Sequence, residues 1–73
     1  MKKYAIESTI SPLGWDSNFG FIENSEYFDT RSEAEQHLKW AKDYCDTHNY
    51  VDSFKNSLVI CETDFEEEGM GDA

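Results

Sequence analysis

One helical segment in the middle of the chain constrains the fold more than any other part of the sequence. Residues 30–33, Thr-Arg-Ser-Glu, match a capping box, and the pattern recurs at residues 32–35, so a helix is expected to begin near Thr30 or Ser32. Apolar side chains then recur at helical spacing and form one stripe, which consists of Ala34, Leu38, Ala41 and Cys45. The segment should end near His48, which makes a helix of about 17 residues.

Alternating runs of residues before this helix predict strands. Residues 3–10 carry aromatic and β-branched side chains at alternate positions, and residues 11–14, Ser-Pro-Leu-Gly, are typical of a turn. Residues 19–23 resume the extended pattern, with Phe19 and Phe21 on one face. The two runs are therefore expected to form an antiparallel hairpin.

A third strand is expected after the helix, at residues 57–63, in a run that is apolar on both faces. Residues 50–56 are expected to form a connection that places Val51 or Phe54 under the helix end. The order is then β-β-α-β, which predicts an α+β fold. We expect a three-stranded antiparallel sheet in the order 2-1-3, with the helix on one face, a right-handed crossover from the second strand to a parallel third strand, and the other face open.

The chain is expected to hold one domain, because 73 residues are too few for two cores. We place this domain at residues 1–65 and an acidic flexible tail at residues 66–73. The side chains expected in the core are Ile6, Phe21, Leu38, Ala41, Cys45, Val59 and Ile60.

The charge balance is strongly acidic. The chain has 16 Asp and Glu against 6 Lys and Arg, a formal net charge of −10. This balance argues against direct nucleic-acid binding, because phosphates require Lys and Arg. Residues 62–73 hold six of the acids and no base. Such a segment either keeps a small protein soluble or complements a basic surface on another protein.

The acidity also matches the charge of a nucleic acid in scale. A globule of this length is about 28 Å across, and duplex DNA of that length carries about 16 phosphates. The chain has 16 carboxylate side chains, although its 6 bases and the concentration of acids at one end reduce the match. The acidity is therefore consistent with two alternatives, mimicry of a nucleic acid and a role in solubility.

The sequence holds no pattern that indicates catalysis or a metal centre. His37 and His48 would lie about 16 Å apart along one helix, too far to share a metal. Cys45 and Cys61 lack the Cys-x-x-Cys spacing of a zinc site, and two cysteines in such a chain are expected to be reduced. A Gly-x-Ser-x-Gly motif and a Gly-rich phosphate loop are also missing. We therefore expect no enzymatic activity, no cofactor and no metal. A small enzyme or metal protein is kept as an alternative hypothesis, after the two classes of function given below.

Two tryptophans are the second signal for a partner. Trp15 is expected in the hairpin loop and Trp40 beside the helical stripe, where each ring either folds back onto the core or stays exposed as an interface anchor. Acidic side chains complete the expected partner-binding set. That set is Trp15, Asp16, Glu23, Glu26, Trp40, Asp43, Asp46, Glu66, Glu67 and Glu68.

In its size, acidity, β-β-α-β order and aromatic-rich hairpin with an acidic tail, the chain resembles small acidic single-domain proteins encoded by phages and other mobile elements. Several of these are anti-CRISPR or anti-restriction inhibitors that occupy the basic nucleic-acid sites of host defence proteins. The likeness is one of class, covers the whole chain and includes no family motif, so it transfers no residue assignments. It implies an inhibitor that binds a nucleic-acid-binding host protein.

Two classes of function therefore lead. The first is an inhibitor or regulator that binds a basic protein surface. The second is a self-associating accessory or assembly domain that uses an open sheet face or edge, which would make the protein a homodimer. An uncharacterised structural domain is a further alternative. No apolar run approaches the ~20 residues of a membrane span or forms a signal peptide, so we expect a cytoplasmic protein without membrane contact.

Overall fold

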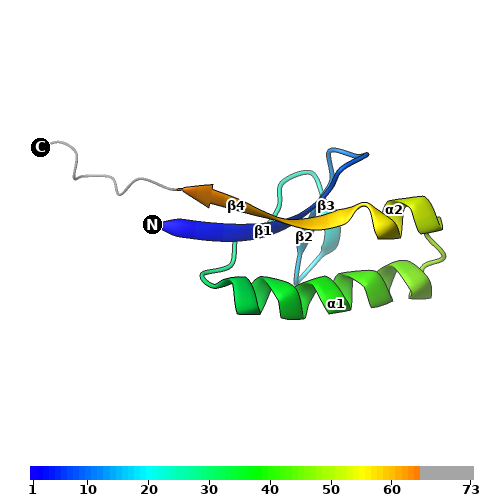
Figure 1. Ribbon diagram of the computed structural model, residues 1–73. Coiled ribbons are helices and arrows are strands. Elements are labelled where there is room, and N and C mark those ends of the chain that lie inside the picture. Colours follow the sequence, from blue (N-terminus) through cyan, green and yellow to red (C-terminus); the bar gives the residue numbers. More distant parts are fainter. Residues whose placement is uncertain (65–73) are drawn as a thin grey trace, which may run out of the picture.

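Four strands and two helices make up residues 1–64, the part of the chain that this computed structural model describes (Figure 1). In chain order the elements are β1 (Lys2–Ser8), β2 (Gly14–Asp16), β3 (Gly20–Ile22), α1 (Arg31–Thr47), α2 (Asp52–Asn56) and β4 (Leu58–Asp64). The strands form one antiparallel sheet in the order β3-β2-β1-β4, and α1 lies across one face of it. The α+β class and the antiparallel sheet are confirmed, whereas the sequence predicted one strand and one helix fewer.

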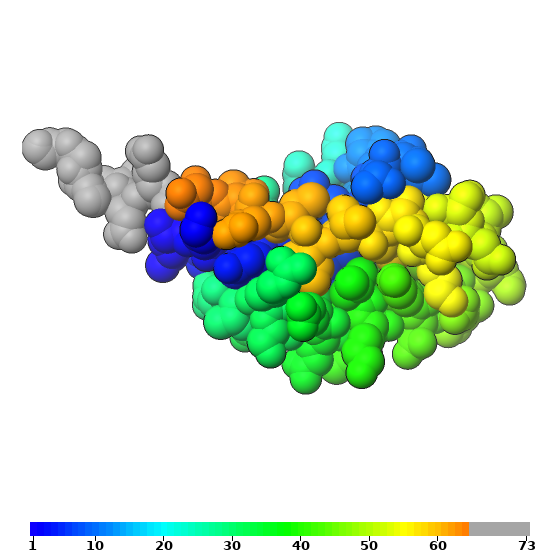
Figure 2. Space-filling model, in the orientation of Figure 1, coloured from blue at the N-terminus to red at the C-terminus, as the bar shows by residue number. Residues whose placement is uncertain are grey.

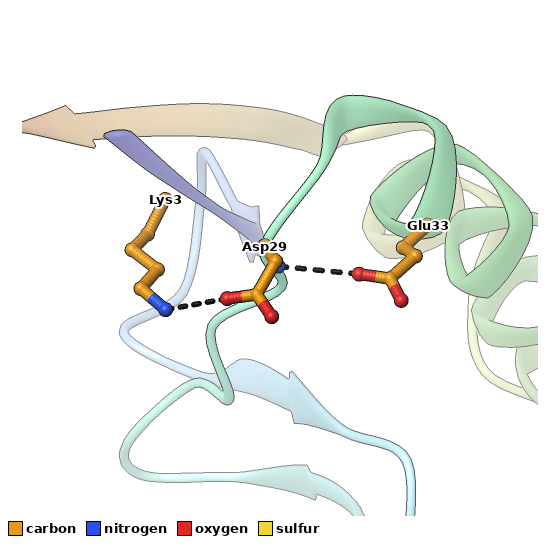
Figure 3. Close-up of polar contacts among 3 residues, drawn as sticks. All are labelled: Lys3, Asp29 and Glu33. Atoms are coloured by element: carbon orange, nitrogen blue, oxygen red, sulfur yellow. Dashed lines mark hydrogen bonds and ion pairs between the residues drawn. The ribbon is translucent and has the colours of Figure 1, made fainter. Parts of the chain in front are cut away.

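Helix α1 begins as its capping box predicts. The hydroxyl of Thr30 accepts a hydrogen bond from the backbone amide of Glu33, at 3.1 Å. The Glu33 carboxylate reaches one residue further back than in the usual box and accepts from the amide of Asp29, at 3.2 Å. The Asp29 carboxylate pairs with Lys3 of β1, so the start of α1 is tied to the first strand (Figure 3). His48 caps the other end, close to the expected place.

The middle of the sheet differs from the expected hairpin. Gly14, Trp15 and Asp16, expected in a turn and loop, form β2, and the pair of Glu7 with Gly14 places β2 beside β1. β3 pairs with β2, so it runs parallel to β1 and antiparallel to β4. Along the sheet the three expected strands keep the order 2-1-3, but β2 lies between the first two, so the prediction that residues 19–23 lie beside the first strand and parallel to the last is wrong. A strand of 3 residues is too short to show alternation in a sequence.

The segment after α1 is also more ordered than the expected connection. Asn49, with a φ of 60°, turns the chain, and α2 then begins after Val51. Of the two candidates for a position under the helix end, Phe54 is 8% exposed and joins the core, whereas Val51 is 65% exposed. Neither of the two helices described here has the length and apolar content to cross a membrane.

Residues paired across β1 and β4 share a face of the sheet, which distinguishes the face toward α1 from the opposite face. Ile6 lies opposite Ile60, on the side that packs against α1. Ala5 lies opposite Cys61 on the other face. Cys45 of α1 is buried in the core, so the sheet separates the two cysteines, and both are free thiols.

The core contains most of the expected apolar positions. Three of them are buried, namely Ile6, Ala41 and Cys45. Three more are partly buried and pack against the core, namely Phe21, Leu38 and Ile60. The prediction that Val59 is buried is wrong, because it lies opposite Glu7 on the face away from α1 and is 39% exposed. The core also includes Trp15, Phe28, Ala34, Phe54 and Leu58.

Candidate protein-interaction surface

Trp15, expected among the partner-binding residues, lies in the core. It is 5% exposed and packs edge-on against Phe21 and Tyr44, with ring centroids 5.1 and 5.5 Å away. Its indole Nε1 is buried and has no hydrogen-bond partner within residues 1–64, so ring contacts hold the side chain in place. Because β2 directs this ring toward α1, Trp15 cannot anchor a partner, and its assignment to the interface was wrong.

Two of the expected acids, Asp16 and Glu26, hold the turn between β2 and β3. The Asp16 carboxylate accepts hydrogen bonds from the amides of Asn18 and Phe19, at 2.7 and 3.3 Å. The Glu26 carboxylate accepts from the amide and the hydroxyl of Ser17, at 2.7 and 2.8 Å. Both acids therefore fix the turn from within, in addition to contributing negative charge.

Phe19 stands in this turn, and sequence reasoning missed it as a functional candidate. It is 74% exposed. It was expected beside Phe21 on one strand face, but β3 begins only at Gly20, where a φ of 85° interrupts the alternation. A Cβ at Gly20 would lie 2.8 Å from the hydroxyl oxygen of Tyr44, so the turn packs closely on α1. The Asp-Ser-Asn run at residues 16–18, with a glycine two positions after it, is typical of a turn and could have revealed this position.

Trp40 is accessible on α1, as one reading of the sequence expected, and is 53% exposed. Its ring meets His37 edge-on at a centroid distance of 4.6 Å, and His37 stacks on Phe28 at 4.5 Å, so the exposed ring is supported by the protein beneath it. Tyr44 lies one turn further along the same flank of α1 and contacts Gly20. The turn between β2 and β3, which we call the hairpin turn, therefore packs against the same flank of α1 that carries Trp40.

The remaining expected acids of residues 1–64 fall into two groups. Glu23 and Asp43 are exposed and form no ion pair with a described residue. Asp46 binds Lys55 of α2 through both carboxylate oxygens, at 2.9 and 3.0 Å, and this hydrogen bonding raises the pKa of Lys55. Asp46 therefore joins α1 to α2, whereas Glu23 and Asp43 are available to a partner. The run Glu66 to Glu68 lies outside the described residues.

Phe19 and Glu23 lie in a part of the chain that lacks bases, whereas Trp40 and Asp43 share α1 with Lys39 and Lys42. No Lys or Arg occurs between Lys3 and Arg31, a stretch that holds five acids. The neighbours of Trp40 three and four positions away on α1 also include no Lys or Arg. We call this set the hairpin–helix surface. It consists of Phe19, Glu23, Trp40 and Asp43, together with the turn acids Asp16 and Glu26.

The two cysteines are not activated for nucleophilic chemistry. Burial raises the pKa of the Cys45 thiol, and burial followed by the nearby Glu7 carboxylate raises the pKa of Cys61. Because the thiolate is the reactive form, these shifts make both cysteines less nucleophilic. No three His, Cys, Asp or Glu side chains in this part of the chain lie together as a metal ion would require. The hairpin–helix surface is therefore the candidate site.

Comparison with known protein families, curated protein sequences and solved structures finds no match for this chain.

Proposed function

We propose that this chain is a stoichiometric inhibitor or regulator that binds a basic surface on another protein and catalyses no reaction. The surface that fits best is the nucleic-acid-binding site of a host protein in the cytoplasm, such as a defence protein, where carboxylates take the place of phosphates. The observation that carries the proposal is the hairpin–helix surface, in which two aromatic rings are exposed: Phe19 in a stretch whose charged residues are all acidic, and Trp40 near Asp43 on α1.

The acids and the rings have separate roles in this proposal. Exposed carboxylates raise the association rate with a basic partner and disfavour acidic ones, but they contribute less to the lifetime of a complex. Aromatic side chains at the centre of an interface supply that lifetime, and truncating such a side chain costs about 2 kcal/mol or more. Phe19 remains 74% exposed in the folded chain. A partner that covers its ring therefore gains the favourable free energy of burying that apolar surface.

The hairpin turn is already in place before a partner arrives. The carboxylates of Asp16 and Glu26 hold the amides of residues 17–19, and the Glu26 amide donates to the carbonyl of Trp15 at 2.9 Å. A preorganised loop loses little conformational entropy on binding, so more of the contact energy appears as affinity. This supports binding as the role of the turn.

The first experiment identifies the partner. The purified chain is immobilised and exposed to bacterial lysate, and the bound proteins are eluted with increasing salt. A nucleic-acid-binding protein released by salt is expected, because ions screen exposed charges. The purified partner is then mixed with labelled duplex DNA or RNA, and fluorescence anisotropy follows its displacement as the chain is added. Full displacement at one copy of the chain per site is the expected result.

Two matched pairs of variants then separate the ring from the charge. Phe19→Ala should weaken binding about 30-fold, mainly through faster dissociation. The control Val51→Ala trims another exposed apolar side chain, 65% exposed against 74%, and should leave affinity unchanged. Glu23→Gln should slow association and reduce its salt dependence, whereas Glu35→Gln, in an exposed pair with Arg31, should change neither.

Two results would overturn the proposal. A partner that still binds its nucleic acid while the chain is bound contradicts competition for the nucleic-acid site. Unchanged affinity in the combined Phe19→Ala and Glu23→Gln variant shows that binding does not use the hairpin–helix surface.

A further inference from the structure

The hydrogen bonds of β1 establish which backbone groups of β4 point away from the sheet. Tyr4 exchanges two backbone hydrogen bonds with Phe28, at 3.0 and 2.7 Å, and the Ser8 amide donates to the carbonyl of Leu13 at 3.3 Å. Even-numbered residues of β1 therefore direct their N–H and C=O groups toward β2 and Phe28. Because these groups alternate along a strand, the odd-numbered residues of β1 form the ladder with β4.

The outward groups of β4 follow from the register. The odd-numbered residues of β1 lie opposite Val59, Cys61 and Thr63, which therefore use their N–H and C=O groups within the sheet. The groups that point outward belong to Leu58, Ile60, Glu62 and Asp64. Among the described strands, β4 is at the end of the sheet order, and Figure 2 shows it, in yellow to orange, uncovered at the surface above α1. Such an edge can accept another strand.

This edge is balanced in charge, unlike the chain as a whole. Lys2 lies 3.3 Å from Glu62, and the amine of Met1 lies 3.6 Å from Asp64, so each acid of β4 has a cationic partner. The whole chain has a net charge of −10, which opposes contact between two copies at most of the surface. Among the described residues, the β1–β4 edge is a place where two copies can meet with little repulsion.

We propose that β4 pairs antiparallel with β4 of a second copy, around a twofold axis at Cys61. The proposal does not rest on the proposed function. Full overlap of residues 58–64 with the same residues of the copy aligns the outward backbone groups with one another. It places Ile60 opposite Glu62 of the copy and Leu58 opposite Asp64 of the copy. Each carboxylate then faces an aliphatic side chain, and no like charges are directly opposed.

The same register gives Cys61 a distinctive position. Because its backbone groups bond to β1, Cys61 and its copy form a pair without hydrogen bonds between them. The Cα atoms of such a pair are about 4.5 Å apart, within the roughly 4.4–6.8 Å range of disulfides. A shift by two residues would place Glu62 opposite its own copy, or Ile60 opposite its own copy, and would separate the two thiols. Cross-linking through Cys61 therefore reports on this register.

The test measures mass and cross-linking on the full chain. Sedimentation equilibrium over a wide concentration range should show a reversible dimer. Treatment with diamide, a two-electron thiol oxidant, in alkaline buffer should then give a disulfide-linked dimer joined through Cys61 alone, as shown by mass spectrometry of its peptides. Cys45→Ser should cross-link like the parent and Cys61→Ser should not. A chain that remains a monomer at every concentration overturns the proposal.

A pair of variants at one position tests the edge itself. Glu62→Pro removes an outward N–H group without removing a bond to β1, so the variant should stay folded and dimerise at least tenfold more weakly. Glu62→Gln removes the same charge but keeps the N–H group and should dimerise like the parent. Circular dichroism verifies that both are folded. If Glu62→Pro is folded and dimerises as the parent does, β4 is not the interface and the proposal fails.

Discussion

Replacing Gly20 by alanine tests the backbone of the hairpin turn. Gly20 has a φ of 85°, a region in which an L side chain costs about 1–2 kcal/mol. The new Cβ would also lie 2.8 Å from the hydroxyl oxygen of Tyr44 and 2.9 Å from its Cζ. Tyr44 cannot move freely, because its ring packs edge-on against Trp15 and Phe21 with centroids 5.5 and 5.7 Å away. Forcing a packed side chain to shift costs about 1–3 kcal/mol.

Together these effects should lower the free energy of unfolding by about 2–5 kcal/mol in Gly20→Ala. A domain of this length has about 4–11 kcal/mol in total, so the loss is large but need not abolish folding. Urea unfolding can be followed through the fluorescence of Trp15, which passes from the core into water. With a slope near 1 kcal/mol per M of urea, the midpoint should fall by about 2 M or more.

Gly20→Asn is the matched variant, because asparagine adopts positive φ more readily than alanine but brings the same Cβ. Its midpoint should lie between those of the parent and Gly20→Ala. Equal losses in the two variants would attribute the whole effect to the contact with Tyr44. A Gly20→Ala midpoint equal to that of the parent would refute both the positive φ and the close packing of the turn on α1.

Two further perturbations test other parts of the fold. Thr30→Ala should lower the free energy of unfolding by about 1 kcal/mol, because it removes the side chain that caps α1. The control Ser32→Ala should have a small effect. Thermal melts that show equal losses of stability in the two variants would contradict the role of Thr30 as the cap. Stability should also fall above pH 9.0, because burial raises the pKa of Cys45 above 9.0 in the folded state and the unfolded chain releases that proton first. The contribution is complete below pH 9.0 and is lost as the pH rises through the folded-state pKa. Cys45→Ala should reduce this slope and leave the part due to Cys61; an unchanged slope in urea titrations at several pH values would argue against the shift.

The sequence revealed the elements whose signals are local and long. The capping box at Thr30 and a stripe of four apolar residues located α1 closely, and the long alternating runs located β1 and β4. β2 and α2 were missed because 3 and 5 residues are too few to establish a period of 2 or 3.6. Missing β2 also gave β1 the wrong neighbour and β3 the wrong direction, because β2 occupies the place beside β1 that residues 19–23 were expected to take.

The interface residues were harder to predict because exposure depends on tertiary contacts. Trp15 and Phe19 are four residues apart in what was expected to be one loop and strand, yet they are 5% and 74% exposed. The difference follows from β2 and from the turn that Asp16 and Glu26 hold, and neither is visible in composition. Asp46 has the same side chain as Asp43 and lies on the same helix, but only Asp46 is within reach of Lys55.

The pairing of β1 with β4 has a consequence for synthesis in the cell. Lys2 lies opposite Asp64 and Ser8 opposite Leu58, so the strand made first depends on the strand made last among the described elements. A ribosome releases β1, the hairpin and both helices before β4 emerges to complete the sheet. During that interval the odd-numbered backbone groups of β1 lack their native partners and can pair with other nascent strands. Non-local pairing of this kind also slows folding, so we expect this sheet to close after translation has passed residue 64 rather than while β1 leaves the ribosome.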